Sequence, residues 1–146
     1  MSSLLEQIRG YEPEIIKIRR RIHSNPELAY QERETSTLIV SKLEALGIKT
    51  TKVAGTGVLG LLKRQGNGKV VALRADMDAL PVEEHVDVPF KSKKKVVMHA
   101  CGHDTHVAML LGAAMLLTEN IDKLVGTVKF IFQPAQHGII NEKLYR

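Results

Sequence analysis

The residues best suited to chemistry lie in a short segment near position 100. It reads His-Ala-Cys-Gly-His-Asp over residues 99–104, and His106 follows soon after. Cysteine and histidine are the usual protein ligands of zinc and related ions. Only Gly102 separates Cys101 from His103, so both side chains can converge on one ion if the backbone is extended and bends at the glycine. The competing interpretation is a capping loop around a buried free thiol.

A second chemically promising segment contains two aspartates, Asp76 and Asp78, within residues 74–81. It follows an apolar stretch, and ligands of open α/β sheets bind beyond the carboxyl ends of strands. Residues two apart face the same way in an extended chain, and two like charges repel unless a cation or a hydrogen-bond donor lies between them. A polar turn with capping aspartates is the alternative. Asp104 is a candidate to orient a histidine through a hydrogen bond.

Helical periodicity is visible in three stretches. Apolar residues recur every three or four positions over residues 4–22, which predicts a helix that ends at Asn25-Pro26 and breaks or restarts near Pro13. A second helix is expected over residues 31–46, with Gly47 in the left-handed position that ends helices. The third is capped by Asp104 or Thr105 and reaches about Leu117.

Strands are expected at 48–53, 58–62, 69–75 and 125–132, with a tight turn at 66–68. Four consecutive apolar residues, Val70–Leu73, predict a strand that is buried on both faces. Helices and strands thus alternate in an α/β order, with no internal repeat or linker.

Composition narrows the class of protein. The chain has 146 residues, enough for one domain or a piece of one, and its 44% hydrophobic and 25% charged residues are typical of a soluble globular protein. Aromatic residues are few and Trp is absent, which argues against a protein that binds single-stranded nucleic acid by stacking bases on exposed rings. The net charge of +5 includes a lysine run at 91–95, which we interpret as a solvated loop, with phosphate or nucleic-acid contact as the alternative.

The expected location follows from three features: membrane spans, a signal peptide and cysteine content. We expect no membrane association, because no apolar stretch approaches the roughly 18 residues that a spanning helix needs. No signal peptide is visible at the N-terminus. A single cysteine, Cys101, forms no internal disulfide, which favours a reducing cytoplasm.

Four segments in this order resemble the aminoacylase-like metallopeptidases: residues 21–28, 74–81, 99–106 and 132–135. That group includes N-acyl-amino-acid amidohydrolases, hippurate hydrolases, auxin-conjugate hydrolases and thermostable carboxypeptidases. The resemblance covers roughly residues 12–135. It implies the N-terminal part of an α/β catalytic domain of the zinc-exopeptidase type. This would be an incomplete three-layer sandwich, without the inserted dimerisation domain.

The resemblance also implies a site and a reaction. Family members use two divalent ions, usually zinc, manganese or cobalt, to hydrolyse an amide in N-acyl amino acids or short peptides. Cys101 and His103 match metal ligands, and Asp78 matches the aspartate that orients a ligand or tunes the site. Asp76, His23 and His106 fall in family motifs with weaker, supporting roles. Zinc is the cofactor we expect first.

The chain departs from the family after Gln133-Pro134-Ala135. Two glutamates follow there in relatives, a general base and then a metal ligand, whereas this chain has Gln136 and His137. A glutamine amide neither takes up nor returns a proton near neutral pH, so we expect little activity. His137 could bind a metal in principle but differs from glutamate in shape and charge, so we expect metal binding to be incomplete. We therefore assign residues 1–146 to the N-terminal part of the catalytic domain, with 136–146 as a divergent tail. The alternatives are a non-catalytic metal-binding or interaction fragment, and one half of an enzyme completed by a second chain.

Overall fold

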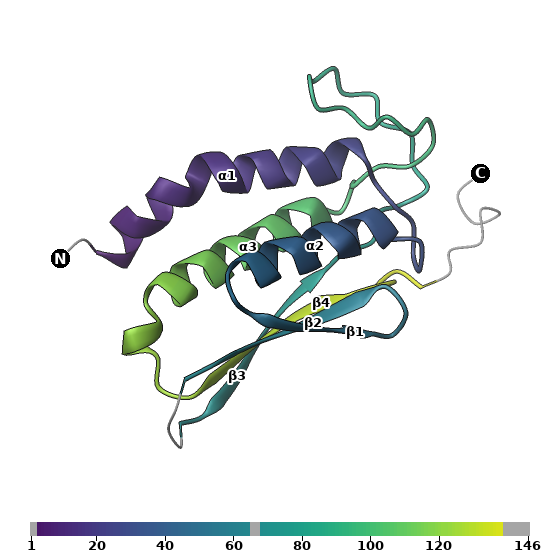
Figure 1. The fold of residues 1–146 in the computed structure, drawn as a ribbon. Helices are drawn as coiled ribbons and strands as arrows, with labels where there is room; N and C mark the ends of the chain where they lie inside the picture. The colour runs from purple at the N-terminus through teal and green to yellow at the C-terminus, as the bar shows by residue number, and fades with distance from the viewer. Residues whose placement is uncertain (1–2, 65–67, 139–146) are drawn as a thin grey trace.

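The computed structural model describes residues 3–64 and 68–138 (Figure 1). Each expected helix and strand is present within these residues, while the turn at 66–68 falls mostly outside them. The elements, in chain order, are α1 (Leu4–Ser24), α2 (Arg33–Ala45), β1 (Lys49–Val53), β2 (Gly57–Lys63), β3 (Val70–Asp76), α3 (His103–Glu119), the 3₁₀ helix η1 (Ile121–Lys123) and β4 (Thr127–Gln133). No helix of this part of the chain combines the length and the apolar composition that crossing a bilayer requires.

The first helix is continuous, so the expected break near Pro13 is wrong. Proline removes one backbone donor and usually kinks a helix. Here the helix is held along its length by packing against α3 (Figure 1). At its start, the Ser3 hydroxyl accepts from the Glu6 N–H, and the Glu6 carboxylate accepts from the Ser3 N–H at 2.7 Å. This capping box stabilises the first turn, and Pro26 stops the helix as expected.

One mixed sheet has the strand order β1-β2-β4-β3. The first three strands in that order are antiparallel, and β3 runs parallel to β4. Helices α2 and α3 pack on one face, and α1 lies over α3 (Figure 1). The core between them is apolar, and its fully buried members include Ile39, Leu43, Leu111, Phe130 and Phe132. The α/β fold is confirmed, and the sandwich is incomplete because helices cover only one face of the sheet among the described residues.

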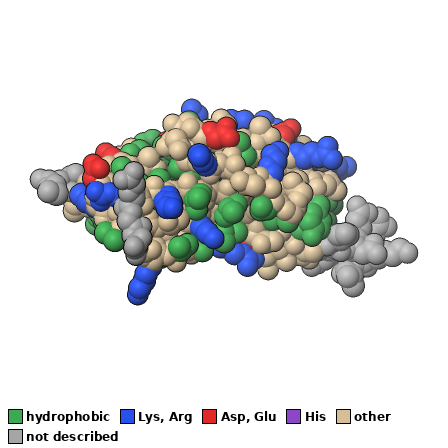
Figure 2. Space-filling model, turned by 60° about the horizontal axis from the view of Figure 1, so that its bottom comes forward, with side chains coloured by type: hydrophobic (Ala, Val, Ile, Leu, Met, Phe, Trp, Pro, Cys, Tyr) green, Lys and Arg blue, Asp and Glu red, His purple; other side chains and the backbone are tan. Residues whose placement is uncertain are grey.

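Strand β3 is not buried on both faces, so that expectation is wrong. Val70 is 60% exposed and Val71 is 52% exposed, whereas Ala75 near the strand's end is buried. The reason is the strand's position: β3 lies at the edge of the described sheet, and α3 covers only one of its faces. Figure 2 shows the underside of the molecule, where hydrophobic side chains are interspersed with Lys and Arg.

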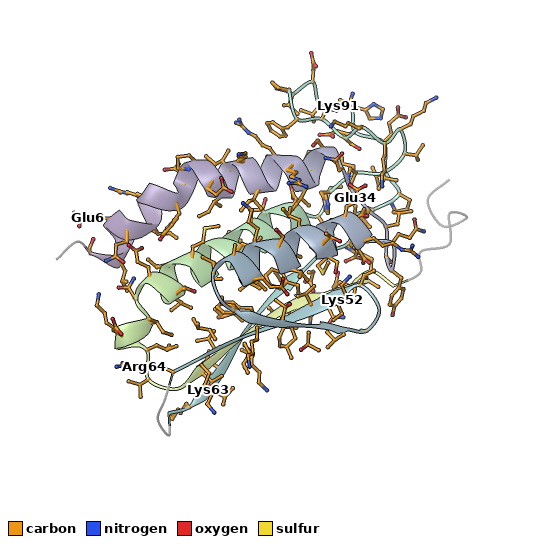
Figure 3. All side chains as sticks on the ribbon, viewed as in Figure 1. Glu6, Glu34, Lys52, Lys63, Arg64 and Lys91 are labelled. Carbon is orange, nitrogen blue, oxygen red and sulfur yellow. The ribbon has the colours of Figure 1, made fainter. Side chains whose placement is uncertain are left out.

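The lysine run lies in the long loop between β3 and α3. Lys91, Lys93, Lys94 and Lys95 are all exposed, and Lys91 stands beyond the C-terminal end of α1 (Figure 3). The loop is closed by a bridge between Leu80 and Met98. This exposure agrees with a solvated loop.

Candidate metal centre

Three segments converge at one edge of the sheet. Strands β3 and β4 are parallel, with Asp76 opposite Gln133, so the residues that follow each strand lie side by side. Helix α3 begins at the same edge with His103, after Gly102 in the left-handed conformation at φ +83°. The cap was expected two or three residues later, at Asp104 or Thr105. The two chemical segments of the sequence, 74–81 and 99–106, are therefore neighbours, as expected.

Asp78 lies at the centre of this edge and is fully buried. Its carboxylate accepts hydrogen bonds from the backbone N–H groups of Gln136 and His137, each at 3.0 Å. The His137 ring nitrogen Nδ1 lies 3.0 Å from Oδ2, and the His103 Nδ1 lies 3.3 Å from Oδ1. Burial raises the pKa of Asp78, but the bonds from His103 and His137 outweigh it and hold the pKa well below its usual range.

His103 also has its Nδ1 2.9 Å from the Asp78 carbonyl oxygen. Both imidazoles therefore use Nδ1 toward the same aspartate. Burial lowers the pKa of His103, but hydrogen bonds with Asp78 and Cys101 more than compensate and raise it to about 10. Any ion that binds this ring must displace that proton.

Two groups of three side chains place their ligand atoms within 4.8 Å of one another. One consists of Cys101, His103 and His137, and the other of Asp76, His103 and His106. The His103 ring is stacked on the His137 ring at 4.8 Å between centroids, and lies 5.4 Å from the His106 ring. The structure thus brings together the three expected site residues, Asp78, Cys101 and His103, and adds His137.

The two groups differ in how their members are engaged. Asp76 accepts from the Arg74 guanidinium at 2.7 and 3.0 Å, which neutralises its charge. His106 is exposed. In the group of Cys101, His103 and His137, Asp78 holds both rings, and only Cys101 lies at the surface. This group is therefore the better organised of the two.

A second polar network, which the sequence did not reveal, surrounds His23. Its Nδ1 lies 2.8 Å from Asp104 and its Nε2 lies 2.9 Å from Glu84, and all three residues are buried. Arg19 also donates to Asp104 at 2.8 Å. Asp104 therefore holds His23, not a ligand histidine, and joins the start of α3 to α1. The only advance signal was the position of His23 in a recognisable motif.

His99 is buried beside this network. It is 3% exposed, and neither ring nitrogen has a hydrogen-bond partner within the described residues. Burial lowers its pKa to about 4, against the opposing charge of Asp104.

Comparison with known proteins places these residues in a family context. The family described as Peptidase family M20/M25/M40 matches residues 72–136. The chain is 55% identical over 138 residues to thermostable carboxypeptidase 2 of Saccharolobus solfataricus, covering 93% of this chain and 35% of that protein. It is 56% identical over 133 residues to IAA-amino acid hydrolase ILR1-like 2 of Arabidopsis thaliana, covering 90% and 30%.

Solved structures agree with these matches. A Bacillus subtilis protein, described as a dinuclear metal binding peptidase from the M20 family, superposes with a TM-score of 0.84. The two are 45% identical, over 88% of this chain and 37% of that one. The chain spans about a third of the length of the curated relatives it matches.

Proposed function

Because residues 72–136 match Peptidase family M20/M25/M40 and 93% of the chain aligns with a thermostable carboxypeptidase, we propose that it forms part of a metal-dependent amidohydrolase or carboxypeptidase. The substrates would be N-acyl amino acids or short peptides. Relatives named thermostable carboxypeptidase, IAA-amino acid hydrolase, hippurate hydrolase and N-acetylcysteine deacetylase support this class. The single cysteine favours a cytoplasmic location.

The observation that carries the proposal is the buried carboxylate of Asp78 between two imidazoles, beside a cysteine. A carboxylate that holds Nδ1 of a histidine fixes the ring so that Nε2 serves a metal. Cys101 and His103 would hold the ion, and Asp78 would position the His103 ring. Thiolate and imidazole donors fit zinc better than manganese, and cobalt is the next match. When bound, such an ion supplies Lewis acidity that polarises a carbonyl group and acidifies water.

The proton-transfer step lacks its usual residue. By the resemblance, Gln136 stands where a glutamate general base is expected, and its backbone N–H donates to Asp78. General-base catalysis is typically worth about 10²–10⁴ in rate. The described residues also offer ligands for one ion where the structural relative is described as dinuclear. We therefore propose that this chain alone does not turn over substrate.

The test is release of free amino acid from N-acetyl and N-benzoyl amino acids, with added zinc, cobalt or manganese. The wild-type chain should give only the background rate. The double variant Gln136→Glu, His137→Glu should not restore activity, since two glutamates do not supply the ligands of a second ion. Metal-dependent turnover that Cys101→Ala abolishes would show that the chain alone is a working enzyme.

A second candidate is one half of an enzyme completed by another polypeptide. The helix-free face of the sheet favours it, because Leu61 is 38% exposed there and Val70 60% exposed. The test is to mix the chain with the remaining two thirds of the Saccharolobus solfataricus carboxypeptidase, separately expressed. A stable complex in native mass spectrometry with metal-dependent hydrolysis is the expected result. Two species that never associate would count against this candidate.

A further inference from the structure

We infer that His137 is a metal ligand, and that with Cys101 and His103 it holds a single ion of the zinc or cobalt type. The inference rests on the proposed metal-dependent function and goes beyond it. By resemblance this position carries a glutamate ligand, so the new element is that a histidine takes over coordination there and changes the chemistry of the site.

The first support is that the backbone carrying His137 is fixed. The N–H groups of residues 136 and 137 both donate to Asp78, and the Ala135 N–H donates to the Glu32 carboxylate at 2.8 Å. Asp78 and Glu32 are both fully buried. His137 itself is half-buried. The side chain thus starts from a backbone that is already held in place, which reduces the entropy lost when it binds an ion.

The second support is the orientation of the ring. Its Nδ1 lies 3.0 Å from Asp78, which leaves Nε2 free to coordinate a metal ion. The His103 ring is nearly parallel to it, at 20°, and also uses Nδ1 toward Asp78. Each of the two stacked rings offers one nitrogen to the same group of ligand atoms. The Cys101 sulfur belongs to the same group of ligand atoms, all within 4.8 Å.

The third support is the weakness of the competing group. Asp76 is paired with Arg74, and His106 is exposed to solvent. Both groups need the single Nε2 of His103, so they cannot both be filled at once. One ion per chain is the stoichiometry that follows.

The ligand set also determines which ion binds. A thiolate with two imidazoles suits zinc and cobalt, whereas carboxylates are preferred by manganese. Exchanging the family's glutamate for His137 should therefore shift the selectivity of the site away from manganese. This gives a measurable consequence that does not depend on hydrolysis.

The experiment titrates the metal-free chain with Co²⁺ and with Zn²⁺ against a chromophoric chelator, following the thiolate-to-cobalt absorption band. We expect one Co²⁺ per chain and a band that Cys101→Ala removes. His137→Ala and His137→Gln should each weaken binding by at least about tenfold, in line with the loss caused even by indirect ligand partners. X-ray absorption of the zinc form should show one imidazole fewer in each. His137→Glu should move the Zn²⁺/Mn²⁺ preference toward Mn²⁺.

His85→Ala is the matched control, since it removes one exposed imidazole outside both candidate groups and should bind Co²⁺ like the wild type. Circular dichroism confirms that each variant is folded. Wild-type affinity in both His137 variants, with Cys101→Ala still defective, would overturn the inference and leave the proposed function standing. Loss of binding in His106→Ala instead would assign the site to the other group. No binding by the wild type would also overturn the inference, because three ligands in place should hold an ion, whereas a part of a longer enzyme can lack binding by itself without contradicting the proposed function.

Discussion

Asp78 connects three parts of the chain through one side chain. It accepts hydrogen bonds from the turn after β4 and from the first residue of α3, while being fully buried itself. A buried carboxylate without such donors would be strongly destabilising. The proximity of Asp78 to Cys101 and His103 could be predicted from the sequence, because Asp78 is a carboxylate that follows the carboxyl end of a strand, where ligands of α/β sheets bind. It did not place His137, because that depends on backbone hydrogen bonds to a buried carboxylate.

Asp78→Asn should lower the free energy of unfolding by about 1–3 kcal/mol at pH 7, since the amide turns an NH₂ group toward N–H donors that then lose their acceptor. The folded-state pKa of Asp78 is depressed, so its stabilisation is present above the unfolded-state pKa of about 3.9 and is lost as the pH falls below it. Urea unfolding of both proteins should therefore converge toward acidic pH. Asp87→Asn, at an exposed position, is the control. A difference that stays constant down to pH 2.5 would contradict the assignment.

His99 gives a prediction with a different pH window. Burial lowers its folded-state pKa to about 4, below the unfolded value of about 6.5. The neutral ring is therefore favoured by folding, and this contribution is complete above about pH 6.5 and lost as the pH falls toward 4. In a chelating buffer, the stability of His99→Gln should fall less than that of the wild type between pH 6.5 and 4. Exposed His85→Gln should behave like the wild type, and equal slopes for all three would refute the prediction.

At the scale of elements, period and end signals located every α-helix and strand of the described residues but not the short 3₁₀ helix η1, and two of the errors came from tertiary context. Pro13 predicts a break by local rules, but packing of α1 on α3 keeps the helix continuous. Val70–Leu73 predicts a doubly buried strand, but burial depends on neighbours that a strand's own sequence does not contain. The start of α3 was misplaced because Gly102, which has no capping side chain, occupies the N-cap.

Gly102 and Gly10 differ in backbone conformation, so replacing each by alanine should change stability in opposite directions. Gly102 has a φ of +83°, where an L-residue is strained, and it lies between the proposed ligands Cys101 and His103. Gly102→Ala should destabilise the fold by about 1–2 kcal/mol. Gly10 lies inside α1 with open space around its Cα, so Gly10→Ala should stabilise by up to about 1 kcal/mol. Thermal unfolding measures both. Two substitutions that shift the melting temperature in the same direction would contradict this account.

At the scale of the whole molecule, the two faces of the sheet differ in whether helices cover them. The helical face forms the core, and the other face carries apolar side chains among lysines, in the register Leu59 opposite Ile131 and Leu61 opposite Lys129. Contiguous exposed apolar surface usually marks an interaction site or an association hazard. The neighbouring positive charges disfavour face-to-face pairing of two copies at low salt. Salt should therefore promote self-association through this face.

The double variant Leu61→Thr, Val70→Thr tests that expectation, because threonine keeps the preference for a strand while removing apolar surface. We expect the wild type to sediment increasingly as oligomers when salt rises from 0.05 to 0.5 M, roughly from a Debye length of 14 Å to one of 4 Å. The double variant should remain monomeric at both, with an unchanged circular dichroism spectrum and unchanged cobalt binding. Leu5→Gln removes an exposed leucine from α1, on the helical side, and should associate like the wild type. If Leu5→Gln suppresses association and the double variant does not, the chain associates through its helical side and the expectation is wrong.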